Sequence, residues 1–199
     1  NARDEMITEQ IVNAVRSLEP LTIPEARIIK ENTAKEGILV LSDCHYGVEF
    51  DIKGLFGETL NAYSPEIFEQ RMWYLFNKVC DIIEKEQLDI IHIWECGDSI
   101  DSILRLTSQL MKLRYGILES TVKYANFLAE WLNRLSEKVN IKLQIVKRSN
   151  HCQLRICGAP KSAFPDEDMS VVITEIIKSR LENNPNIEII ENPTGYPFQ

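Results

Sequence analysis

Three short apolar runs alternate with longer amphipathic segments in this sequence. The apolar runs cover residues 38–41, 88–94 and 141–146, and their length and composition are typical of buried strands. The apolar residues of the intervening segments, 64–87 and 114–138, recur at helical spacing. A strand–helix–strand–helix–strand order predicts a parallel sheet with right-handed crossovers. We therefore expect an α/β fold with a mainly parallel sheet and flanking helices.

The N-terminal part has a different pattern. An apolar rhythm over residues 4–18 indicates a helix, which two prolines end, and a short extended piece is expected around 26–29. We therefore predict an N-terminal helical and extended segment over 3–36, followed by a single α/β domain over 37–199.

The rest of the chain supplies the connections. Residues 47–63 contain three glycines and no clear period, which predicts a loop. The triplet Ser64-Pro65-Glu66 is a typical helix start, with a capping hydroxyl, a proline at the first helical position and an acid in the first turn. A further helix is predicted over 166–182 and a short strand near 187–190.

Composition excludes several classes of protein. The chain of 199 residues has a formal net charge of −8 at pH 7, which disfavours a broad basic surface for duplex DNA. No apolar run approaches the ~18 residues of a transmembrane helix, so no membrane partner is expected. The 5 cysteines form no C-x-x-C pair, which indicates reduced thiols in a cytoplasmic protein.

Each predicted strand ends in a polar block. The blocks read "SDCHYG", "CGDSIDS" and "RSNHCQ". Their polar residues are Asp43 and His45, Asp98 and Asp101, and Asn150 and His151. Because parallel strands bring their carboxyl ends to one edge of a sheet, where ligands gather, we expect the three blocks to form a single site. Their oxygen and nitrogen donors suit Mn²⁺, Fe²⁺ or Zn²⁺ better than Ca²⁺.

In this order, the three blocks resemble the D-x-H, G-D-x-x-D and G-N-H-[D/E] motifs of the calcineurin-like metallophosphoesterases. The resemblance covers roughly residues 37–152. The overall sequence pattern is most similar to the phosphoesterases found in bacteriophages and prophages. It implies an αββα sandwich, of which this chain would form the N-terminal half. The sequence departs from the family at Ser149, which replaces a glycine, and at Cys152, which replaces an acid.

The resemblance implies hydrolysis of phosphate mono- or diesters, nucleotide and nucleic-acid phosphodiesters included. It implies two divalent ions, with Mn²⁺ first and Fe²⁺ or Zn²⁺ as alternatives. The roles it implies are Asp43 and His45 on the first metal, Asp98 as the bridge, Asn150 on the second metal, His151 as the catalytic acid and Asp101 as its orienting partner. Arg148 is a candidate contact for the substrate phosphate.

The family completes its metal shells with later histidines, including a G-H-x-H block, and this sequence has no histidine after His151. We therefore expect the complete protein to be the active enzyme and this chain alone to be inactive. The alternative is a non-catalytic binding or interaction domain that keeps the fold. A nucleotide-binding doubly wound domain is disfavoured, because no glycine-rich phosphate loop follows any of the three strands. The substrate, the physiological metal and the oligomeric state stay open.

Individual residues also have structural interpretations. Asn150 could cap a turn, Asp101 could cap the next helix, and Arg148 could be a solvated charge. Cys44, Cys96 and Cys152 adjoin the polar blocks, where packing under the loops is the simpler interpretation than a thiolate zinc site.

Overall fold

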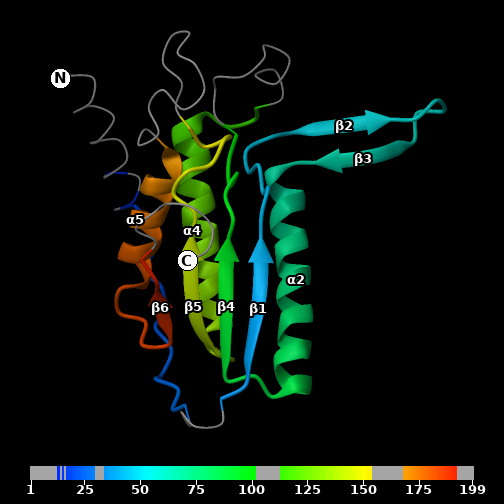
Figure 1. Cartoon of the computed structure of the whole chain (residues 1–199). Coiled ribbons are helices and arrows are strands. Elements are labelled where there is room, and N and C mark those ends of the chain that lie inside the picture. The colour runs from blue at the N-terminus through cyan, green and yellow to red at the C-terminus, as the bar shows by residue number, and fades with distance from the viewer. Residues whose placement is uncertain are drawn as a thin grey trace.

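A four-stranded parallel sheet forms the centre of the molecule (Figure 1). The computed structural model describes residues 13, 15, 17–29, 34–101, 113–153 and 168–191. The sheet has the order β1-β4-β5-β6, and every neighbouring pair is parallel. Its strands are β1 (Glu36–Leu41), β4 (Ile90–Glu95), β5 (Asn140–Ile145) and β6 (Ile187–Ile189). The predicted parallel arrangement of the first three strands is confirmed.

Among the described residues, three long helices connect the strands and pack as one layer. They are α2 (Pro65–Glu86), α4 (Ile117–Leu135) and α5 (Met169–Leu181). In Figure 1, α4 lies behind β4 and β5, with α2 on one side of it and α5 on the other, and α4 contacts both neighbours. The predicted α/β class, with a mainly parallel sheet and flanking helices, is confirmed. None of the described helices is long and apolar enough to cross a membrane.

Capping residues place the helix starts. Ser64 accepts a hydrogen bond from the Ile67 backbone N–H at 3.3 Å, and Pro65 begins α2 as the sequence predicts. The start of α5 is later than predicted, because Asp168 is its cap and accepts from the Ser170 N–H at 2.8 Å. Residues 166 and 167, where that helix was expected to begin, lie outside the described residues.

The two faces of the sheet differ in burial. Along β5 the residues alternate between buried and half-buried, and Leu143 has 0% exposure on the helix-covered face. On the opposite face of β1, Ile38 is 61% exposed and Val40 is 54% exposed. The predicted buried strand at 38–41 therefore has an exposed outer face, since the described helices pack on the other face of the sheet.

A β-hairpin occupies the segment that was predicted as a loop. Strands β2 (Phe50–Lys53) and β3 (Thr59–Tyr63) pair in antiparallel fashion, and Figure 1 shows them projecting from the carboxyl end of the sheet. The loop prediction was wrong because it relied on a buried face to reveal a strand. Ile52 is 51% exposed and Leu60 is 65% exposed, so most of the hairpin has no buried face to impose an alternating pattern.

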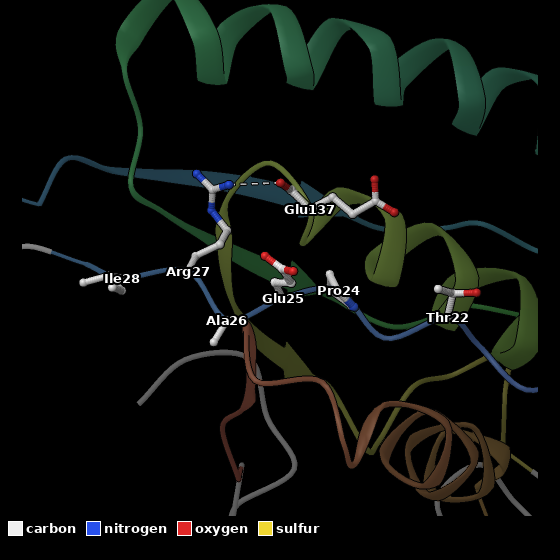
Figure 2. Close-up of a pocket in the computed structure, with 7 residues that line it drawn as sticks. All are labelled: Thr22, Pro24, Glu25, Ala26, Arg27, Ile28 and Glu137. Atoms are coloured by element: carbon white, nitrogen blue, oxygen red, sulfur yellow. Dashed lines mark hydrogen bonds between the residues drawn. The ribbon is translucent and has the colours of Figure 1, made fainter.

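Within the N-terminal segment, residues 19–29 have no regular secondary structure, and the described residues 13 and 15 of the predicted helix are helical. Its Arg27 N–H donates to Asn186 Oδ1 at 2.7 Å, and its guanidinium donates to the Glu137 carbonyl at 3.0 Å. Figure 2 shows the open cavity between this segment and Glu137. Because Glu137 precedes β5, that cavity lies at the amino ends of the strands, away from the predicted site. Most of the predicted helix over 4–18 lies outside the described residues, and the domain boundary at residue 36 stays a prediction.

Candidate metal centre

The turns after β1 and β4 are bonded to each other beyond the ends of the strands. The backbone N–H of Asp43 donates to the Gly97 carbonyl at 3.2 Å, and the N–H of His45 donates to the Asp98 carbonyl at 2.9 Å. Tyr46 continues this parallel pairing through a bridge with Ile100. The first two polar blocks are thus held side by side by main-chain bonds, which fixes where their side chains begin.

Left-handed backbone conformations concentrate in these turns. The φ angles of Asp43, His45 and Asp98 are 54°, 45° and 55°, and that of Gly97 is 96°. Such angles cost a non-glycine residue about 1–3 kcal/mol, and they persist where surrounding contacts impose them. A Cβ atom on Gly97 would lie 2.8 Å from Ser149 Cβ, so only glycine lets the second and third blocks approach this closely.

Asp98 joins the third block to the other two. Its Oδ1 accepts the His151 backbone N–H at 2.7 Å, and its Oδ2 accepts the Asn150 amide at 3.3 Å. The His151 Nε2 atom lies 4.0 Å from Asp98 Oδ2. One donor atom each from His45, Asp98 and His151 lies within 4.8 Å of the others, a group that could hold a metal ion. The expectation that three strand ends form one site is therefore confirmed in its geometry.

Asp101 lies against both histidines. Its Oδ1 accepts a hydrogen bond from His151 Nδ1 and lies 3.6 Å from His45 Nδ1. The two imidazole rings meet edge to face, with centroids 4.3 Å apart. The nearby Asp101 carboxylate raises the pKa of His45 against the opposing effect of burial. Burial acts to raise the pKa of Asp101 itself, but the proximity of the two histidines outweighs this and lowers it.

The donor set fits a divalent transition metal. His45 Nδ1 is buried and has no hydrogen-bond partner among the described residues, an arrangement that is costly unless a ligand satisfies it. Asp43 is exposed, and its Oδ1 lies 3.7 Å from His45 Nε2, at the edge of the cluster. Carboxylate oxygens mixed with imidazole nitrogens suit Mn²⁺, Fe²⁺ or Zn²⁺. The metal roles of Asp43, His45, Asp98 and Asn150 stay predictions that this geometry supports.

Two of the cysteines near the site, Cys44 and Cys152, are buried. Burial raises the pKa of Cys44 to about 12 and that of Cys152 to about 11. Their burial supports packing under the loops as their role. Ser149, which stands where the family has glycine, accepts the Cys152 N–H at 3.2 Å and so stabilises the third turn.

Sequence reasoning missed two acidic residues that support the turns. Glu95, at the end of β4, is 1% exposed and accepts hydrogen bonds from Ser99 Oγ at 2.6 Å and the Gly97 N–H at 3.3 Å. Burial raises the pKa of Glu95 to about 7. Asp168 accepts the Ser149 N–H at 2.9 Å and ties the third turn to α5. Of these two residues, only Asp168 could have been found from the sequence, because an aspartate just before a helical segment is a typical helix cap.

A cavity of about 360 Å³ opens beside the cluster. Its described lining consists of Asp43, Cys44, His45, Val48, Phe50, Tyr63, Asp101 and His151. Phe50 and Tyr63 come from the hairpin, which no sequence pattern linked to the site. Arg148 is exposed on the turn after β5 and is not among these lining residues, so its contact with substrate phosphate stays a prediction.

Comparison with known proteins gives a prophage relative. The chain is 30% identical over 188 residues to the SPbeta prophage-derived uncharacterized protein YonJ of Bacillus subtilis (strain 168). The match covers 94% of this chain and 45% of that protein, so the chain spans less than half the length of the curated relative that it matches. No family model matches the sequence, and no solved structure matches it. The name of the relative gives its origin and no activity.

Proposed function

We propose that this chain forms the N-terminal half of an αββα metallophosphoesterase, which hydrolyses phosphate mono- or diesters in its full-length form. The observation that carries the proposal is the meeting of His45, Asp98 and His151 at the carboxyl edge of three adjacent parallel strands. The exposed side chains of Ile38 and Val40 on the outer face of β1 support the sandwich, because a second sheet would cover them. The prophage relative supports a phage setting. The free thiols of the described cysteines support a cytoplasmic one.

In this proposal Asp43 and His45 would hold a first divalent ion, Asn150 would hold a second, and Asp98 would serve both ions. Bound ions of this kind polarise phosphoryl oxygens and lower the pKa of water. Mn²⁺ is our first choice, with Fe²⁺ and Zn²⁺ as alternatives.

His151 and Asp101 provide the proton for the leaving oxygen. Asp101 accepts from His151 Nδ1, which fixes the orientation of the ring and leaves Nε2 facing the cluster. The role of Asp101 is to position His151, while His151 is the acid.

The same cluster favours a second candidate, a domain that binds a divalent ion without hydrolysis. Within the described ranges, the closely grouped donors His45, Asp98 and His151 suffice for one ion. A single ion can support binding or assembly, whereas the proposed reaction uses two.

Hydrolysis of bis(4-nitrophenyl) phosphate by the full-length protein with Mn²⁺ tests the proposal. Asp98→Asn keeps the side-chain shape and removes the charge, so we expect nearly all turnover to be lost while the circular dichroism spectrum is kept. Asp81→Asn is a matched control, because Asp81 is 71% exposed on α2. Near-normal turnover of Asp98→Asn would rule out the bridging role. Metal binding without any turnover in the unchanged protein would favour the second candidate.

A further inference from the structure

We propose that the cavity beside the cluster binds a nucleobase stacked on Phe50, so that the ester taken by this site is a nucleotide or the end of a single strand. This inference rests on the proposed function for the phosphate end of the ligand. The evidence for base binding comes from the hairpin, whose residues have no part in the proposed hydrolysis.

The lining of this cavity combines two kinds of side chain. Asp43, His45, Asp101 and His151 are polar, and three of them belong to the candidate metal centre or contact it. Val48, Phe50, Tyr63 and the buried Cys44 are the apolar part of the lining. A volume of about 360 Å³ lies within the range of small-molecule sites, which combine apolar walls with a few polar groups. This lining suits a ligand that carries both a phosphate and a flat apolar group.

The aromatic pair in the lining, Phe50 and Tyr63, is anchored through contacts of Tyr63. Phe50 and Tyr63 face each other across the hairpin, and their rings stack with centroids 5.9 Å apart and planes 19° from parallel. The Tyr63 hydroxyl donates to the Cys44 carbonyl, and the Tyr63 ring packs against the hydrophobic core. Phe50 is half-buried at the mouth of the hairpin, on Tyr63. A planar ligand that stacks on Phe50 extends an existing stack, with little loss of side-chain freedom.

A nucleotide has both required groups. Its base supplies a π-face of the kind that aromatic side chains bind in single-stranded nucleic acids, with tolerance for base identity. The net charge of −8 disfavours a long duplex, whose affinity depends on phosphate neutralisation by many basic residues. One nucleotide, or the end of a single strand, needs far fewer such contacts. Phosphate esters of aliphatic alcohols lack the flat group and leave the aromatic part of the lining unused.

Calorimetric titration of the 199-residue chain tests the proposal, with Mn²⁺ present. The two probes are adenosine 5′-monophosphate and ribose 5-phosphate, which share the sugar and the phosphate and differ in the base. We expect the nucleotide to bind roughly 5- to 150-fold more tightly, the range that one stacked base contributes. Phe50→Leu should bring this ratio close to one, and Phe50→Tyr should keep it.

Phe56→Leu is the matched control. Phe56 lies in the turn of the same hairpin and is 90% exposed, so this change has the same chemistry outside the cavity. The ratio should be unchanged in this variant. Equal affinity for the two probes, no binding of either at millimolar concentration, or a ratio that Phe50→Leu leaves intact would each overturn the proposal.

The experiment separates this inference from the proposed hydrolysis. If the protein prefers the nucleotide through Phe50 but hydrolyses no ester, the base-binding proposal stands and the proposed hydrolysis fails. If the full-length protein hydrolyses esters but binds the nucleotide and ribose 5-phosphate with equal affinity, the proposed hydrolysis stands and the base-binding proposal fails.

Discussion

Asp101 is the residue on which the two histidines converge. It is bonded to His151 Nδ1 and lies 3.6 Å from His45 Nδ1, so its carboxylate serves the proposed acid and a proposed metal ligand together. The sequence predicted only the first of these contacts.

His151 and Asp101 should behave as one unit in the full-length protein. General acid catalysis contributes about 10²–10⁴-fold, so His151→Ala should reduce turnover by roughly that factor. Asp101→Asn should cost less, and the double variant should be little worse than His151→Ala, because residues that act together are not additive. Steady-state kinetics with a poor leaving group measures this, and a very good leaving group should hide most of the loss. Losses that multiply would show that the pair does not act together, and loss of metal in His151→Ala would make His151 a ligand.

Glu95 should make stability depend on pH. Its folded pKa of about 7 lies above the ordinary value of 4.5, so between these values the folded protein binds more protons than the unfolded chain. The free energy of unfolding should therefore fall as the pH rises through this range, by roughly 3 kcal/mol at most.

Urea denaturation at a series of pH values measures this effect as the difference between the unchanged protein and Glu95→Gln, which cannot titrate. Other titrating groups are common to both proteins and cancel. Identical pH slopes for the two proteins would show that Glu95 is ionised in the folded state throughout this range.

At the scale of single elements, the turns after the strands carry the site, and Gly97 sets how closely two of them approach. We expect Gly97→Ala to lower the free energy of unfolding by about 2–4 kcal/mol, because it combines a positive φ with a contact to Ser149. Gly57 also has a positive φ, but a Cβ added there would meet no atom within 4 Å. Gly57→Ala should therefore lower the free energy of unfolding by about 1 kcal/mol. Denaturation of both variants checks this, and equal losses would mean that the third turn simply moves aside.

The elements that sequence analysis predicted are those that bury one face. The strand ends and their polar blocks could be predicted because apolar runs marked the strands and apolar residues at helical spacing marked the helices between them. The hairpin was not predictable in this way, since Ile52 and Leu60 are exposed and leave no period to detect. Along α2 the buried positions depend on the exact orientation of the helix, since Ile83 is buried and its neighbour Ile82 is 53% exposed.

Long-range contacts explain what else the sequence did not reveal about the site. The place of Glu95 depends on Tyr124 of α4, whose hydroxyl lies 3.4 Å from Glu95 Oε1. The place of Phe50 depends on its partner Tyr63, across the turn of the hairpin. Neither contact leaves a local pattern, because both residues are ordinary for their strands. Residue types at strand ends predicted the candidate ligands, while the walls of the cavity required the fold.

At the scale of the whole molecule, the two faces of the sheet should differ in their contribution to stability. Ile93 has 0% exposure beneath the helices, so Ile93→Ala should lower the free energy of unfolding by about 2–5 kcal/mol. Ile38 is 61% exposed on the outer face, and Ile38→Ala in this chain should cost less than about 1 kcal/mol. In the full-length protein the cost at Ile38 should rise, because the proposed second sheet covers that face. An unchanged cost there would argue against the sandwich.

Calorimetric titration of this chain with Mn²⁺ tests whether the three strand-end blocks form a metal centre. We expect one weak site, which is lost in His45→Ala and in Asp98→Asn and is kept in the exposed control Asp81→Asn. Two tight sites would contradict the claim that this chain carries only part of the centre. No binding at millimolar Mn²⁺, or binding that survives both substitutions, would show that the cluster is not a metal site.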